Sequence, residues 1–216
     1  MNCKRISFGL LLAVITVLLL AMPGECISAK KILKKVEDTY EDLKDFRAGF
    51  SQTMFIDSTD SGYTVMGNLC VKKPDKFRLE LEHQTMVSDG DTLWTYVPGN
   101  QQVLVDQADT TGEVTRPDQL FLKYFKEAEA ELVGEEKLNG HGCYLLHLKP
   151  KKSEAISSLR VWVDQKTWLA RRLEVTDASG MITHYLFTDV QINPELADSL
   201  FVFRAPPDVE IIDLRW

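Results

Sequence analysis

The chain has 216 residues, of which 44% are hydrophobic, and its 25 lysines and arginines against 32 aspartates and glutamates give a net charge of −7. This acidic balance argues against nucleic acid or an anionic membrane surface as a partner, because both are negatively charged. The length suits one domain with a sizeable core once a short leader is set aside.

The first 26 residues have the pattern of a secretory signal peptide. Lys4 and Arg5 precede an apolar run over 6–21, and a Pro-Gly-Glu-Cys sequence at 23–26 ends that run. The run is too short, and too closely followed by a charged helix-forming stretch, to predict a membrane span. We expect a signal at 1–26 and a single exported domain over 27–216.

The cysteines leave two questions open. Cleavage can follow Cys26 or Ala29, or Cys26 can carry a lipid; Glu25 directly before it disfavours lipidation, because a lipoprotein signal has a small residue there. We expect no N-terminal lipid. Cys70 and Cys143 can pair in an oxidising compartment, and the sequence does not decide whether they meet.

The first element after the leader is predicted to be an amphipathic helix over 29–45. Ile32, Val36, Tyr40 and Leu43 recur at spacings of four, four and three, which places them in one apolar stripe. Lysines and then carboxylates fill the other face, an order that the helix dipole disfavours. The helix therefore depends on whatever its stripe covers.

Short strands are predicted from residue 46 to residue 105. Apolar and polar residues alternate in five runs, which begin at Phe46, Tyr63, Phe77, Leu93 and Val103. Turn signals at 73–76, 88–91 and 98–100 separate consecutive runs and favour antiparallel hairpins.

The pattern changes after residue 117 and predicts a second helix. Phe121 and Phe125 fall on one helical face, and residues 127–132 are expected to extend this helix or to form another. Alternating runs then predict four further strands, at 144–148, 159–163, 168–175 and 181–190.

About ten strands in consecutive hairpins, with few helices, indicate a mainly β fold. We expect an unclosed antiparallel β-barrel, a half-barrel, whose concave apolar face encloses a cavity under a helical lid. Each apolar residue alone fits an ordinary core, and the hypothesis of a cavity rests on the set. The residues expected to line it are Val36, Tyr40, Leu43, Phe50, Phe77, Leu79, Trp94, Tyr96, Phe121 and Phe125.

Alternation along the predicted strand at 93–97 leaves open which of its two faces points into the cavity. Either Trp94 and Tyr96 point into the cavity, or Leu93, Thr95 and Val97 do. We predict the first arrangement, because threonine is a poor residue for an apolar cavity and a tryptophan offers a large apolar contact.

No sequence motif indicates catalysis or metal binding. The four histidines form no H-E-x-x-H, and C-x-x-C, G-x-S-x-G and glycine-rich phosphate loops are missing from the sequence. A hydrolase acting on lipids needs a nucleophile and a base that no motif supplies. We therefore expect a protein that is not an enzyme and needs no cofactor or metal.

Four segments, by their order and spacing, resemble the LolA-type periplasmic outer-membrane lipoprotein carriers. They are FRAGFSQ at 46–52, KKPDKFR at 72–78, VSDGDTLWTY at 87–96 and FVFRAPP at 201–207. The resemblance spans nearly the whole chain after the leader. It implies a monomeric half-barrel that takes triacylated lipoproteins from an inner-membrane ABC transporter and passes them to an outer-membrane receptor or to the outer membrane itself.

Two positions bear on how such a carrier opens. Lys73 stands where the family usually has an arginine that helps to hold the lid closed, so we predict a lysine latch near the cavity mouth. Tyr40 corresponds to a lid-helix position that touches the cavity. The alternative reading keeps the fold and makes the protein an outer-membrane lipoprotein receptor or an envelope sensor of lipid or lipoprotein. The sequence names neither the cargo nor a separate receptor.

Overall fold

The computed structural model describes residues 27–55, 62–108, 128–151, 153 and 155–215. The predicted signal at 1–26 and the predicted second helix with Phe121 and Phe125 lie outside these residues. In the described part, no helix is long and apolar enough to cross a membrane.

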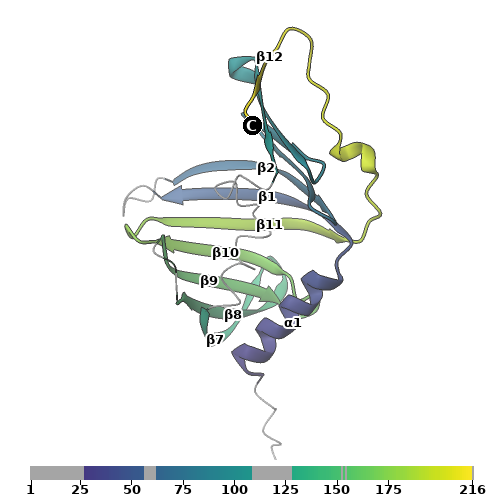
Figure 1. Ribbon diagram of the computed structural model, residues 1–216. Helices are drawn as coiled ribbons and strands as arrows, with labels where there is room; N and C mark the ends of the chain where they lie inside the picture. Colours follow the sequence, from purple (N-terminus) through teal and green to yellow (C-terminus); the bar gives the residue numbers. More distant parts are fainter. Residues whose placement is uncertain (1–26, 56–61, 109–127, 152, 154, 216) are drawn as a thin grey trace, which may run out of the picture.

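One curved sheet of twelve strands forms the body of the molecule, with helix α1 crossing one side of it (Figure 1). The sheet order is β12-β6-β5-β4-β3-β2-β1-β11-β10-β9-β8-β7, so the two edges are β12 and β7 and the sheet is not closed. This confirms the predicted unclosed β-barrel. The strands are β1 Asp45–Phe55, β2 Gly62–Lys72, β3 Lys76–Leu81, β4 Thr85–Ser88, β5 Thr92–Val97, β6 Gln102–Gln107, β7 Ala128–Leu138, β8 His141–Pro150, β9 Ile156–Asp164, β10 Ala170–Asp177, β11 Ile182–Ile192 and β12 Glu210–Asp213.

The connections explain how a meander becomes a half-barrel. β1 to β6 and β7 to β11 are two runs of antiparallel neighbours, and β1 pairs with β11 to join them. β12 adds to β6 in parallel. Short 3₁₀ turns at Pro98–Asn100 and Asp198–Phe201 complete the described elements.

Helix α1 spans Ala29–Asp42 and ends three residues earlier than its apolar stripe predicts. The Ser28 hydroxyl caps its start by accepting the Lys31 N–H at 3.3 Å. Leu43 is already extended, and β1 begins at Asp45. The stripe continues past the helix because Leu43 faces the same apolar interior from the turn that follows.

Two apolar clusters occupy the face of the sheet that α1 covers, which we call the inner face. The helix cluster lies on β8, β9 and β10 and includes Ile32 and Val36, both fully buried. The aromatic cluster is formed by Leu43, Phe46, Ala48, Phe50, Leu69, Val71, Phe77, Leu79, Met86, Leu93, Leu169 and Phe187. Tyr40 and Tyr185 pack against both clusters.

The prediction of helix for residues 127–132 is wrong, since β7 begins at Ala128. Ala128, Ala130 and Leu132 pack on the helix cluster, while glutamates at 129 and 131 alternate with them. This is the period of a strand, although alanine and glutamate are good helix formers. Tertiary packing decides the outcome here.

Cys70 and Cys143 are both free thiols. Cys70 packs with Leu196 and Phe201, whereas Cys143 packs with Leu145 and Trp162. The two cysteines therefore lie in separate clusters and do not pair with each other.

Gly67 is expected to be essential for the close approach of β2 and β3. A Cβ at this position would collide with the backbone carbonyl of Glu80. Backbone cannot yield as a flexible side chain can, so Gly67→Ala should lower the free energy of unfolding by about 2 kcal/mol or more. Urea denaturation of the purified protein measures this change.

Gly134→Ala is the matched control, because Gly134 also lies in a strand and has nothing within 4 Å of the added Cβ. It should change stability by less than about 0.5 kcal/mol. Equal effects of the two substitutions would show that general strand propensity, and not the approach to Glu80, determines the loss.

Candidate functional site

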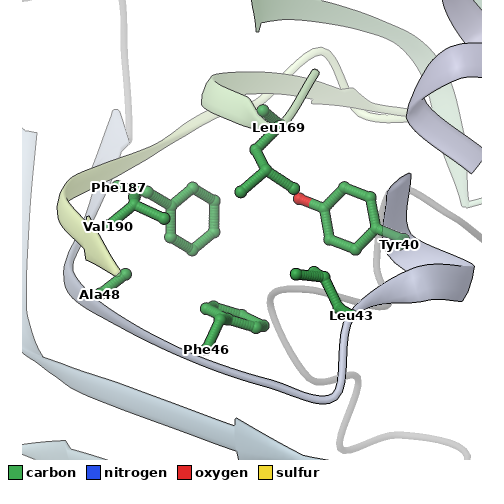
Figure 2. Close-up of a pocket in the computed structure, with 8 residues that line it drawn as sticks. Tyr40, Leu43, Phe46, Ala48, Leu169, Phe187 and Val190 are labelled. Carbon is green, nitrogen blue, oxygen red and sulfur yellow. The ribbon is translucent and has the colours of Figure 1, made fainter. Parts of the chain in front are cut away.

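A small apolar pocket lies between the end of α1 and the inner face of the sheet (Figure 2). Its walls come from four places in the chain: the end of α1, β1, the start of β10 and β11. The lining residues are Tyr40, Leu43, Phe46, Ala48, Leu169, Ala170, Phe187 and Val190. Figure 2 shows the Tyr40 ring facing across the pocket, with its hydroxyl toward Leu169.

The pocket is almost filled by its own side chains. About 10 Å³ is open to the centre of a water molecule, close to the minimum that one buried water needs. Tyr40 and Leu43 form the wall that belongs to α1 and its C-terminal turn. A larger apolar molecule can enter this place only if some of the lining side chains are displaced.

Lys73 bonds the end of α1 from the turn between β2 and β3. Its Nζ donates to the backbone carbonyl of Tyr40 at 2.8 Å and to that of Glu41 at 2.5 Å. The last carbonyls of a helix have no partner within the helix and carry its negative dipole end. No basic residue lies in the last turn of α1 itself, so Lys73 supplies the cation from another element.

The corner after α1 is fixed by Asn193, a residue that the sequence did not single out. Its Oδ1 accepts the N–H of Lys44 at 2.8 Å and that of Asp45 at 3.3 Å. The Asn193 N–H donates to the Asp45 carbonyl at 2.9 Å, and the Lys73 N–H donates to the Lys44 carbonyl at 2.9 Å. These bonds hold residues 44 and 45 to the sheet where α1 ends.

Asp164 fixes the opposite wall of the pocket. Its carboxylate accepts the N–H groups of Lys166 and Thr167 at 2.8 and 3.0 Å and the Arg171 Nε–H at 3.0 Å. Burial raises the pKa of Asp164, but these hydrogen bonds and the Arg171 charge outweigh it and leave the pKa below its ordinary value. The carboxylate thus stays ionised and orders the turn that carries Leu169.

The two apolar clusters of the inner face bring together six of the predicted cavity residues. Val36 packs in the helix cluster, and Leu43, Phe50, Phe77 and Leu79 pack in the aromatic cluster. Tyr40 lies between the two clusters and lines the pocket. The inner face brings these side chains together, although of the predicted residues that the structure describes only Tyr40 and Leu43 reach the pocket.

The placement of Trp94 and Tyr96 on this face is wrong. Leu93 belongs to the aromatic cluster, and alternation along β5 turns Trp94 and Tyr96 to the other face. There Trp94 stacks on Phe203, with ring centroids 6.2 Å apart, and Tyr96 lies 6.3 Å from the same ring. The segment before β12 thus covers the outer face of β5, so this strand needs apolar residues on both sides.

No group of three or more metal-ligating side chains lies close together in the described part of the chain. The inner face carries mostly buried apolar side chains in its two clusters, with tyrosines packed against them. Such a surface is suited to binding hydrocarbon.

The family model described as outer membrane lipoprotein carrier protein LolA matches residues 41–204. An outer-membrane lipoprotein carrier protein of Chromohalobacter salexigens is 27% identical over 176 residues, covering 80% of this chain and 82% of the relative. One of Nitrosomonas europaea is 26% identical over 211 residues, covering 94% of this chain and 97% of the relative.

Two solved structures share the fold. An uncharacterized conserved protein from Thermus thermophilus superposes with a TM-score of 0.59 at 13% identity, covering 86% of this chain and 98% of that one. The lipoprotein LppX of Mycobacterium tuberculosis gives a TM-score of 0.51 at 11% identity, covering 79% and 99% of the two chains. At these identities the likeness concerns the fold alone.

Proposed function

We propose that this chain, which belongs to the outer membrane lipoprotein carrier protein family LolA, carries lipoproteins across the periplasm by enclosing their acyl chains against the inner face of the sheet. The donor is an inner-membrane ABC transporter and the acceptor an outer-membrane receptor or the outer membrane. The cargo is triacylated, and the carrier works as a monomer without a cofactor or a catalytic step.

The physical need for such a carrier lies in the cost of exposing acyl chains to water. Each methylene group costs about 0.8 kcal/mol in water, so three chains cost tens of kcal/mol. The carrier need only bind the acyl chains more favourably than water does and less favourably than the next acceptor does. A binding site that is filled by its own side chains when empty meets this condition, because refilling offsets part of the cost of release.

The observation that carries the proposal is the end of α1. Tyr40 and Leu43 close a pocket that is otherwise formed by the sheet, and Lys73 bonds the same end of the helix from outside. We infer that α1 is the lid, that residues 44 and 45 are its pivot, and that Lys73 is the latch of the empty state.

Photo-cross-linking in cells tests the proposed cargo. A photoreactive amino acid at Val190, a pocket-lining residue of β11, should capture triacylated lipoproteins that mass spectrometry identifies. The same group at Thr64, an exposed residue of β2, is the control and should capture none. Lipoprotein adducts from both sites or from neither would contradict the proposal.

The intact mass of the exported protein tests the receptor alternative. A mass with an added diacylglyceryl group would favour that alternative.

Lys73→Leu is expected to raise the apparent affinity for acyl ligands. The substitution removes two charge-assisted hydrogen bonds of the closed empty state, each exposed and together worth about 1–2 kcal/mol. Because a ligand binds only the open fraction, a larger open fraction lowers the apparent Kd by about 5–30-fold. Fluorescence titration with an acyl probe measures the Kd, and transfer to acceptor membranes should be slower.

Two control variants separate the latch from general effects. Lys73→Arg keeps the hydrogen-bond donors, so its apparent Kd should stay close to that of the unaltered protein. Lys76→Leu removes a half-buried lysine at the start of β3, which pairs with Asp198 at 3.1 Å and not with α1. An unchanged or higher Kd for Lys73→Leu would show that these bonds do not hold the lid closed.

A further inference from the structure

A polar pair lies on the inner face between the two apolar clusters. Tyr185 of β11 and Gln52 of β1 are register partners, directly opposite each other on antiparallel strands. Their neighbours two residues away, Phe187 and Phe50, form another such pair within the aromatic cluster. Because side chains alternate along a strand, Tyr185 and Gln52 point to the same inner face as these phenylalanines.

The Tyr185 ring is held in place by apolar contacts. Its centroid lies 6.0 Å from that of Phe50, with the planes at 37°, and the ring packs against both clusters. On the other side its register partner is Leu173, which is fully buried. These contacts fix the ring, and with it the hydroxyl, at the junction of the clusters.

Neither polar group of this pair has a hydrogen-bond partner among the residues that the structure describes. Polar groups that lie beside apolar clusters without a protein partner are free to bond to water or to a ligand. Burial raises the pKa of Tyr185, in keeping with a hydroxyl in a medium of low polarity. Both residues are half-buried, so a ligand on the inner face can reach them.

We propose that Tyr185 and Gln52 bind the ester or amide carbonyl of an acyl ligand, which fixes where the chains begin within the interior. The phenol O–H and the amide N–H are donors, and a carbonyl oxygen is an acceptor that an acyl ligand carries and a plain hydrocarbon lacks. The hydrocarbon chains then extend over the two apolar clusters. This assignment rests on the proposed carrier function and adds recognition of the linkage between chain and headgroup.

Two probes of equal chain length test the assignment. One is a soluble short-chain diacyl phospholipid, and the other is its dialkyl ether counterpart, which has no carbonyl. The unaltered protein should bind the ester probe about fivefold more tightly, the effect of one neutral hydrogen bond. Tyr185→Phe should lose this preference by weakening the ester probe about fivefold while leaving the ether probe unchanged. Gln52→Leu should act in the same direction.

Tyr96→Phe is the matched control, because Tyr96 lies on the outer face beside Phe203, away from the proposed path of the chains. It should alter binding of neither probe. Equal losses for both probes in Tyr185→Phe would show a packing role and overturn the assignment, as would an unaltered ester preference. If the unaltered protein binds the two probes equally, the carrier proposal stands and the carbonyl site does not. Binding of neither probe overturns both.

Discussion

A brominated acyl ligand is expected to quench the fluorescence of Trp168 and to leave that of Trp94 unchanged. Bromine quenches by contact, so the loss of signal reports which indole touches the chain. Trp168 packs on the helix cluster at the inner face, with its ring 5.8 Å from that of Tyr144 and nearly parallel to it. The next two residues, Leu169 and Ala170, line the pocket. Trp168→Phe should therefore remove more than half of the quench.

Trp94→Phe and Trp162→Phe are the controls for this experiment. Trp94 stacks on Phe203 at the outer face. Trp162 has the guanidinium groups of Arg160 and Arg172 over its ring, at 5.1 and 4.7 Å from the centroid, and donates its indole N–H to Glu136 at 2.7 Å. Each control should retain the ligand-dependent quench. A quench that survives Trp168→Phe and falls in Trp94→Phe would place the ligand on the opposite side of the sheet.

The phase of β5 shows where sequence reasoning was insufficient. Alternation predicts which residues share a face, but it predicts which face is inside only when the other face is polar. Leu93, Trp94 and Tyr96 give both faces of β5 apolar character, because Phe203 from a distant part of the chain covers the outer one. That contact joins residues more than a hundred positions apart, and no local pattern reports it.

The fold could be predicted because many weak local signals agree. Alternating runs and turn residues predict antiparallel hairpins, and an unclosed sheet was the result. Lys73 could be singled out from a motif, and it donates to two backbone carbonyls at the end of α1. Asn193 could not be singled out from the sequence. Its role depends on accepting the N–H groups of Lys44 and Asp45, which lie near the other end of the chain.

Val36→Asp is expected to cause the largest loss of stability. Val36 is fully buried in the helix cluster, and with Ile32 it forms the anchored half of α1. An unpaired carboxylate there either stays charged in an apolar environment or must take up a proton, and both cost free energy. The free energy of unfolding should fall by about 3–5 kcal/mol, as measured by chemical denaturation with circular dichroism.

Lys35→Asp tests whether the loss comes from burial or from charge on the helix. Lys35 is the exposed neighbour of Val36, so its replacement should change stability by less than about 0.5 kcal/mol. Val36→Ala should lower the free energy of unfolding by about 2 kcal/mol, a loss between those of the other two variants, because it removes apolar contact without adding charge. Should Val36→Asp cost no more than Val36→Ala, α1 would have to be loosely packed in the empty protein. The closed state would then depend on the Lys73 bonds, and the lid would open without exposing the helix cluster.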